Sequence, residues 1–439
     1  MTLLDQPVAF TRRRQAPAGI GSHGPALLPL AAGEQYRFTF EMTACVGCHS
    51  CEVACAEQNG TPVDEAWRRV GELEFGAFPD TRRYNLSMAC NHCLEPTCLS
   101  GCPTEAFVKL ENGIVAHLAS ECIGCQYCIW NCPYEVPVFS KARRIVSKCD
   151  MCQPRIDAGQ EPACVLACPT RAIGIEPVDV AAWRADHSSA DAPGLPPAGL
   201  TMSTTRIRQP AGTPPEMTAA DDHRVEPQGP HWSLVALTLL TQLSQGTVAA
   251  TVALHLSGAA STETMAGAGL GAFVAGAVAL GVSLLHLGRP TRALKALRNL
   301  RTSWLSREVA LFSAFSVLSL AYALALGGRM RALSTVLGPL AVVAGTAGVY
   351  ASGRLYLVPA RPVWNSARTP LAFFATAGAT GPLLALLCLD RSGVASGGIA
   401  VLVGVAVAGT LVQAGVLGHL VATVRRRRDR QHRGTAHLL

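Results

Sequence analysis

The chain has 439 residues, a formal net charge of +7 and 49% hydrophobic residues, so it is long enough for two or three domains. Sixteen of its 17 cysteines lie between Cys45 and Cys168, whereas the part after about residue 232 consists mainly of Ala, Leu, Val and Gly. The positive charge lies in short loops and in the C-terminal run RRRRDRQHR. It therefore does not form the broad basic face typical of a nucleic-acid-binding protein.

Residues 1–37 are expected to form a flexible N-terminal leader. The stretch TRRRQ is similar to a twin-arginine signal, but the apolar region that follows, GPALLPLAAG, is short and interrupted by proline. We expect no cleavable secretory signal. Without an oxidising compartment, and with such closely repeated spacings, the cysteines are not expected to form disulfides.

The cysteines fall into four groups of four. In chain order the groups are Cys45, Cys48, Cys51 and Cys55; Cys90, Cys93, Cys98 and Cys102; Cys122, Cys125, Cys128 and Cys132; and Cys149, Cys152, Cys164 and Cys168. The first and third groups, CVGCHSCEVAC and CIGCQYCIWNCP, have the C-x2-C-x2-C-x3-C spacing of bacterial ferredoxins. In that pattern three thiolates bind one cluster and the fourth binds a second cluster.

A four-thiolate zinc site is the structural alternative, but such sites use paired CxxC arms rather than runs of four cysteines. The pattern therefore predicts four [4Fe–4S] clusters and no three-iron cluster. Clusters bound only by cysteine conduct single electrons, and nearby charges and hydrogen bonds set their potentials. Lys148, beside Cys149, is either such a charge or a solvated surface lysine. His49 and His92 are either hydrogen-bond donors to sulfur or surface groups, and we expect Trp130 to pack over a cluster.

Residues about 38–180 resemble the four-cluster iron–sulfur subunit of the dimethyl sulfoxide reductase family of molybdopterin oxidoreductases. The motifs that carry the resemblance are CNHCLEPTC, CIGCQYCIWNCPY, KCDMC and CVLACPTRAI. It implies an α+β double-ferredoxin domain over residues 38–184, in which group one pairs with group four and group two with group three. The ligand sets it implies are Cys45, Cys48, Cys51 and Cys168; Cys149, Cys152, Cys164 and Cys55; Cys90, Cys93, Cys98 and Cys132; and Cys122, Cys125, Cys128 and Cys102.

Residues 185–230 are rich in Pro, Ala, Gly and charge, which predicts a linker that buries no core of its own. Residues 231–425 are then expected to form an all-α polytopic membrane bundle with about six helices, because a span needs about 20 apolar residues. A buried soluble bundle is the alternative. A basic tail follows at 426–439. The apolar stretches are 232–256, 265–287, 308–327, 333–356, 370–389 and 397–424.

The basic residues outside these stretches are unequally divided between the two sides of the membrane. Fifteen Lys and Arg residues follow spans two, four and six, and three follow spans three and five. The positive-inside rule then places the iron–sulfur domain on the cytoplasmic side of an inner membrane. The competing explanation is that these arginines dock an acidic partner surface.

Ionisable residues at the ends of two spans are candidates for a quinone site, because quinone exchanges protons together with electrons. His286 closes span two and Glu308 opens span three, both on the cluster side; interfacial helix caps are the alternative. The motifs LLHLGRPTRALKALRN, WLSREVALF and RTPLAFFATAGATGPLL resemble the dimethyl sulfoxide reductase membrane anchor. This resemblance implies quinol binding by His286, Glu308 and Arg292. It departs from that anchor in having six helices rather than eight and in being fused. No haem is expected.

These features together predict an electron-transfer and membrane-anchor subunit that relays electrons between quinone and a separate molybdopterin catalytic subunit of the S- or N-oxide reductase type. The same relay could run in the oxidising direction, as in a sulfite dehydrogenase-like complex facing the cytoplasm. A membrane ferredoxin that only tethers a partner or senses redox state is the alternative of another class. The chain itself has no substrate-reducing site, so no catalytic residue is expected.

Overall fold

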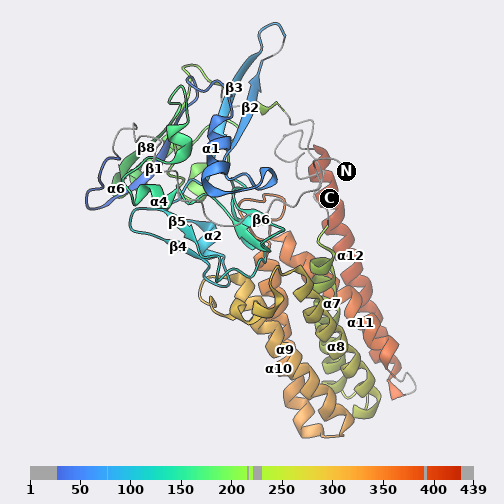
Figure 1. Cartoon of the computed structure of the whole chain (residues 1–439). Helices are drawn as coiled ribbons and strands as arrows, with labels where there is room; N and C mark the ends of the chain where they lie inside the picture. Colours follow the sequence, from blue (N-terminus) through green and yellow to red (C-terminus); the bar gives the residue numbers. More distant parts are fainter. Residues whose placement is uncertain (1–26, 77, 215–216, 221–229, 390–392, 427–439) are drawn as a thin grey trace, which may run out of the picture.

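The computed structural model describes residues 27–426 except residues 77, 215–216, 221–229 and 390–392. It has an N-terminal mixed α/β part that carries sixteen cysteines, followed by six long apolar helices, and the α/β part lies over one end of the helix bundle (Figure 1). Most of the expected leader and of the basic tail lies outside the described residues.

The α/β part is built from short elements. Its strands are β1 (Glu34–Glu41), β2 (Arg69–Phe75), β3 (Arg82–Met88), β4 (Phe107–Lys109), β5 (Val115–His117), β6 (Val138–Ser140), β7 (Ile145–Ser147), β8 (Ile173–Asp179), β9 (Arg206–Arg208) and β10 (Thr218–Ala219). Its helices are α1 (Ser50–Asn59), α2 (Thr97–Ser100), α3 (Tyr127–Asn131), α4 (Gln153–Ile156), α5 (Ala163–Leu166) and α6 (Val180–Ala185), with 3₁₀ turns η1 (Val63–Glu65), η2 (Ser188–Ala190) and η3 (Ala198–Leu200).

Strand β1 is the centre of the main sheet, where it pairs antiparallel with β8 and parallel with β9. Its alternating side chains Tyr36, Phe38 and Phe40 are all buried in the core, and Gln35 and Arg37 on the opposite face are buried as well, so the first half of the strand is covered on both faces. A second sheet joins β10, β2 and β3, and β4–β5 and β6–β7 form two hairpins. The cysteine groups lie in the loops and short helices between these strands, which supports the α+β ferredoxin-like class.

The segment expected to be a linker is in part a component of this domain. Strand β9 adds to β1, and β10 adds to β2. Ala190 and Ala198 are buried beside Trp183, and the Trp183 indole Nε1 donates a hydrogen bond to the Ser203 carbonyl at 2.9 Å. The expectation that this composition buries no core is therefore corrected for residues 185–214. Small side chains in 3₁₀ turns pack closely enough to be enclosed even where long apolar side chains are lacking.

The described residues of the C-terminal part form six long helices and two 3₁₀ turns that follow α8. They are α7 (Trp232–Leu256), α8 (Thr262–Ser283), η5 (Leu284–His286), η6 (Pro290–Leu297), α9 (Trp304–Gly327), α10 (Arg331–Leu355), α11 (Arg368–Cys388) and α12 (Ser396–Arg426).

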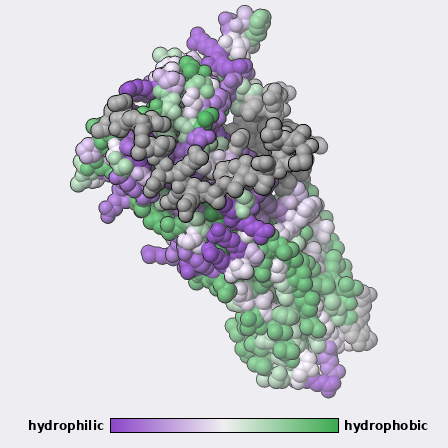
Figure 2. Space-filling model, in the orientation of Figure 1, coloured by the Kyte–Doolittle hydropathy of each residue, from purple (hydrophilic) through white to green (hydrophobic). Residues whose placement is uncertain are grey.

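Each of the six helices is long and apolar enough to cross a membrane, so the prediction of six spans is confirmed for a multi-pass membrane protein. Figure 2 shows hydrophobic residues over the bundle and hydrophilic residues over much of the α/β part. Helix α7 is the most enclosed and α12 the least, at 56% and 11% buried. A Cβ added to Gly246 of α7 would lie 2.1 Å from the Ala377 carbonyl oxygen of α11, so small residues permit this close helix contact.

Candidate functional site

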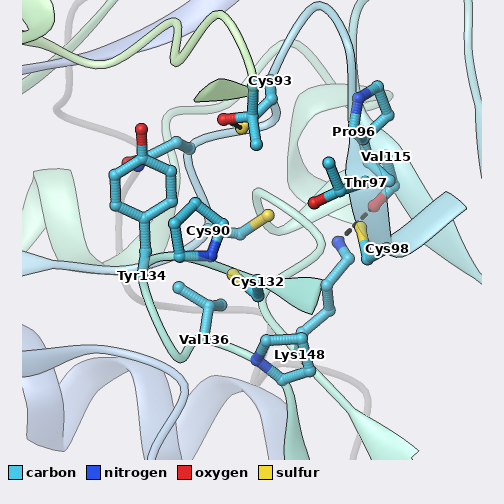
Figure 3. A pocket seen from close by; sticks show the side chains of 14 residues that line it. Cys90, Cys93, Pro96, Thr97, Cys98, Val115, Cys132, Tyr134, Val136 and Lys148 are labelled. Carbon is cyan, nitrogen blue, oxygen red and sulfur yellow. Dashed lines mark hydrogen bonds between the residues drawn. The ribbon is translucent and has the colours of Figure 1, made fainter. Parts of the chain in front are cut away.

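Two cavities in the α/β part are each lined by four cysteines. Site 1 is lined by Cys45, Cys48, Cys51 and Cys168. Site 3 is lined by Cys90, Cys93, Cys98 and Cys132, which face a common space (Figure 3). Each set combines cysteines from two groups that lie far apart in the sequence.

The remaining eight cysteines form two further sets, according to the charge interactions between their sulfurs. In site 2, Cys55, Cys149 and Cys152 each interact with Cys164. In site 4 the interacting residues are Cys102, Cys122, Cys125 and Cys128. The two cavities contain two of the four ligand sets that the family resemblance implies, and the other two sets remain predictions that these sulfur interactions support.

The four sites form a row. The sulfur of Cys51 in site 1 interacts with Cys164 in site 2, and Cys149 in site 2 interacts with Cys90 in site 3. Cys128 in site 4 interacts in turn with Cys98 in site 3. Site 1 is at the surface, since Cys48 is exposed, and site 4 lies at the end next to the membrane helices.

Left-handed backbone conformations shape the two ferredoxin-type loops in the same way. In group one Gly47 and His49 have φ of 67° and 57°, and at the equivalent places in group three Gly124 and Gln126 have φ of 72° and 61°. Such residues turn the chain around a common centre and direct backbone N–H groups inward. At site 2, for example, the Met151 N–H donates to the Cys149 sulfur at 3.3 Å.

The electrostatics of the sites fit negatively charged iron–sulfur clusters. Burial raises the pKa of the Cys55 and Cys93 thiols to about 12, so each needs a bound cation to ionise. Among the described residues, no three His, Cys, Asp or Glu side chains converge closely enough to hold a single metal ion. Two nitrogens of the buried Arg68 guanidinium have no hydrogen-bond partner among these described residues. Iron–sulfur clusters at these sites would supply both the iron cations that the buried thiols need in order to ionise and a negative neighbour for the Arg68 guanidinium.

The polar residues around the cysteines are more buried than expected. Lys148 is buried, and its ammonium donates to the carbonyls of Val115 and Cys149 (Figure 3 draws the first contact). His92 is also fully buried. Its Nδ1 accepts the Val115 N–H, so Nε2 carries the proton and faces the Cys149 sulfur at 3.9 Å. These contacts favour the interpretation as groups that interact with the cluster ligands over the surface alternatives. His49 is half exposed and pairs with Glu52.

A cavity of about 360 Å³ lies where site 4 meets the helix bundle. Its wall includes Cys125 of site 4 together with His286 and Glu308. The remaining wall is mostly apolar, from α7, α8, α9 and the η6 turn. Glu308 lies in the second turn of α9, which begins four residues earlier than expected, and its side chain is buried. The structure therefore brings two of the three predicted quinone residues to a single cavity beside a cysteine of the row.

The hydrogen bond of His286 defines its tautomer. His286 Nε2 lies 3.2 Å from the Cys125 carbonyl oxygen. A carbonyl only accepts, so Nε2 carries the proton and Nδ1 of the neutral ring is left as an acceptor. The edge of the His286 ring faces His231, with centroids 5.0 Å apart.

Sequence reasoning did not identify two further cavity residues, Tyr127 and Trp130, as part of this site. Tyr127 lines the cavity, and its hydroxyl donates to the Leu355 carbonyl at 2.9 Å. Trp130 packs against Tyr356 and Trp364. Both follow Cys125 in the third group, and an aromatic pair inside a cysteine motif was the available signal.

Arg292 lies elsewhere. It does not line the cavity, and its guanidinium donates to the Ser120 carbonyl at 2.5 Å. It belongs to a basic turn, formed by η6 and its flanking residues, that packs on the α/β part. In this turn Arg289 donates to the Ala119 carbonyl, and both Lys295 and Arg298 form ion pairs with Glu121.

Backbone contacts complete this interface. The Arg289 N–H donates to the Ile123 carbonyl at 3.0 Å, and a Cβ on Gly288 would lie 2.1 Å from the Arg144 carbonyl oxygen. The loop that carries site 4 is therefore in direct backbone contact with the segment that follows His286.

Comparisons with known proteins match both parts of the molecule. A 4Fe–4S dicluster domain model matches residues 82–177, and the model of the DMSO reductase anchor subunit matches residues 228–425. A chain of the anaerobic dimethyl sulfoxide reductase of Haemophilus influenzae is 36% identical over 184 residues, which cover 40% of the present chain and 89% of the relative. The corresponding chain of the Escherichia coli enzyme is 34% identical, over 41% of the present chain and 92% of the relative.

A third relative is a subunit of the sulfite dehydrogenase of Allochromatium vinosum, 35% identical over 31% of the present chain and 67% of the relative. The matches to the reductase chains and to the anchor lie in sequence order on one polypeptide. The protein thus belongs to the dimethyl sulfoxide reductase family, as an electron-transfer 4Fe–4S dicluster domain fused to the membrane anchor of that family.

Proposed function

We propose that this protein relays electrons between membrane quinone and a separate molybdopterin catalytic subunit through four [4Fe–4S] clusters. The clusters supply one-electron conduction. Their proposed ligands are the cysteines of site 1 (Cys45, Cys48, Cys51, Cys168), site 2 (Cys55, Cys149, Cys152, Cys164), site 3 (Cys90, Cys93, Cys98, Cys132) and site 4 (Cys102, Cys122, Cys125, Cys128). The observation that carries the proposal is the shared cavity of Cys125, His286 and Glu308.

The two ionisable residues of the cavity match the proton chemistry of a quinol. A quinol that gives up two electrons also releases two protons. Nδ1 of His286 is an available acceptor, because Nε2 is held by the Cys125 carbonyl. The Glu308 carboxylate is the second acceptor, and the apolar wall suits a hydrophobic ring. Arg292 contributes through the domain interface that holds site 4 over the cavity.

The opposite end of the row suits a protein partner. Site 1 is at the surface, with Cys48 exposed and the neighbouring Val46 and Val53 both more than half exposed. Exposed apolar side chains beside the terminal site favour docking of another subunit. Homology to the anaerobic dimethyl sulfoxide reductase of Haemophilus influenzae supports a catalytic subunit as that partner. We place this end on the cytoplasmic side of the inner membrane.

Similarity to a sulfite dehydrogenase favours a second direction of flow, in which a reduced substrate is oxidised and its electrons pass through the clusters to quinone. The cavity serves either direction, because each proton acceptor is a donor in reverse. Feeding the purified complex with either quinol or sulfite and following cluster reduction by electron paramagnetic resonance distinguishes the two.

The residue test compares wild type, Glu308→Gln and the control Glu263→Gln. Glu263 forms an exposed ion pair with Arg329 at the far end of the bundle. Loss of a general base lowers a rate by about 10²–10⁴-fold, so Glu308→Gln should slow quinol-driven cluster reduction by at least about 100-fold and Glu263→Gln should not. Wild-type clusters that dithionite reduces but quinol does not would leave the membrane part as an anchor only.

A further inference from the structure

Arg68 is a buried cation without an acidic partner among the described residues. It lies just before β2 and is only 3% exposed. One guanidinium nitrogen, Nη1, donates to the Ser87 hydroxyl at 3.1 Å, while Nε and Nη2 have no hydrogen-bond partner in the described ranges of the chain. No ion pair to Arg68 forms within the described part of the chain. A buried, unpaired charge is strongly unfavourable, so this guanidinium requires a negative neighbour.

The negative neighbours available to Arg68 are cysteine sulfurs from two adjacent sites. Burial lowers the pKa of Arg68, but its charge interactions with cysteine thiolates outweigh this effect and leave the pKa raised. The interacting sulfurs belong to Cys51 of site 1 and to Cys55, Cys149 and Cys164 of site 2. Ser87 extends the contact, because its hydroxyl also lies 3.4 Å from the Cys51 sulfur.

Arg37 in the same domain shows how a structural arginine is held here. Both arginines are buried and each lies over an aromatic ring, Arg37 over Trp183 at 4.4 Å and Arg68 over Phe38 at 4.8 Å. Arg37, however, has a carboxylate partner: its Nε donates to Glu176 at 2.8 Å. Both arginines thus pack on an aromatic ring, but only Arg37 forms an ion pair with a carboxylate among the described residues.

We infer that Arg68 is a positioning residue that supplies one fixed positive charge to both site 1 and site 2 and so raises the reduction potentials of the two clusters held there. Each one-electron reduction makes a site one unit more negative, and a neighbouring positive charge stabilises that reduced form more than the oxidised form. The inference rests on the proposed ligand sets. Its functional consequence is that the half of the row facing the partner holds electrons more firmly.

The experiment is a potentiometric titration of the full-length protein in detergent, read by electron paramagnetic resonance, with iron content measured in parallel. The variants are Arg68→Gln, Arg68→Lys and the matched control Arg37→Gln. In Arg68→Gln we expect two of the four midpoints to become more negative, each by about a tenfold change in the reduction equilibrium, or about 59 mV for one electron. Arg68→Lys should restore most of the shift, and Arg37→Gln should leave all four midpoints unchanged.

Four unchanged midpoints in Arg68→Gln at full iron content would overturn the inference, as would an equal shift in Arg37→Gln. If Arg68→Gln does not retain its iron, the Ser87→Ala variant tests the inference. It leaves the Arg68 charge in the protein but removes the hydroxyl that holds the guanidinium and lies beside the Cys51 sulfur. We then expect the site 1 midpoint to fall, and four unchanged midpoints would refute the proposal. A wild-type protein with fewer than four clusters would instead contradict the proposed ligand sets.

Discussion

Gly288→Ala tests whether the contact between the two parts of the chain controls electron entry. Gly288 packs against the loop of site 4, and a Cβ there would lie 2.1 Å from the Arg144 carbonyl oxygen and 2.9 Å from its carbon. Both atoms belong to the backbone, so no side-chain rotation relieves the contact. The substituted segment must move away from the β6–β7 turn that carries Arg144, and so from the site 4 loop beside that turn, or push the turn aside.

The size of the movement follows from the contact distance. Ordinary contacts begin at 3.4 Å, so the two backbones must separate by about 1.3 Å. The 3.0 Å hydrogen bond from the Arg289 N–H to the Ile123 carbonyl would lengthen with them, and His286 would shift relative to Cys125. A misplacement of about 1 Å can cost about 10²-fold in rate, equivalent to about 2.7 kcal/mol. We expect quinol-driven cluster reduction to slow by about that factor.

The assay is rapid-mix, freeze-quench electron paramagnetic resonance with a quinol analogue, after dithionite reduction has shown that all clusters are present. Gly404→Ala is the matched control, because Gly404 lies in α12 and an added Cβ there meets no atom within 4 Å. It should reduce at the wild-type rate. Equal rates in Gly288→Ala and Gly404→Ala would refute the view that this backbone contact sets the geometry between the cavity and site 4.

Two further predictions concern stability. Tyr127→Phe removes the 2.9 Å hydrogen bond to the Leu355 carbonyl across the interface and should lower the free energy of unfolding by about 1–3 kcal/mol. Thermal denaturation measures this loss, and Tyr350→Phe, at a half-exposed tyrosine, is the control. An equal loss of stability in both variants would contradict the prediction. Burial, aided by the charges of Lys148, Arg143 and Arg289, lowers the pKa of His117 to about 4. Its neutral form stabilises the fold by up to roughly 3 kcal/mol above pH 6.5, a contribution that is lost as the pH falls towards 4. His117→Phe should therefore shift acid bleaching of the clusters to lower pH, and an unchanged acid midpoint would refute this role.

The cysteine groups and the spans were predictable because both are local patterns. Spacing within CxxC runs identifies ligands, and 20 apolar residues identify a span, without knowledge of tertiary contacts. Grouping the cysteines into four sets required the family resemblance, because each set joins residues such as Cys45 and Cys168 from opposite ends of the domain. The sequence likewise could not show that Arg206–Arg208 adds a strand to β1, since pairing between segments 167 residues apart leaves no periodic signal.

Arg292 and Arg68 show the same limit for single residues. The family resemblance implies quinol binding by Arg292, whereas in the structure its guanidinium donates to the Ser120 carbonyl, because η6 turns it towards the α/β part. Arg68 lies 13 residues after Cys55, outside every cysteine motif, and nothing in its neighbours signals burial. Its proposed role depends on the pairing of β2 with β3, because this pairing places Ser87 and the Cys51 sulfur of site 1 beside the guanidinium.

The basic residues that predict orientation also bear on how the two parts are held together. Within the part of the chain that the structure describes, five of the fifteen on the cluster side contact the α/β part: Arg289, Arg292, Lys295, Arg298 and Arg361. Docking within the chain thus accounts for five of the fifteen basic residues for which an acidic partner was the competing explanation. The other ten still outnumber the three on the opposite side, so the positive-inside rule gives the same orientation without the docking residues. The basic residues from which the positive-inside rule predicts a cytoplasmic ferredoxin part and those that hold site 4 over the cavity are therefore largely separate sets.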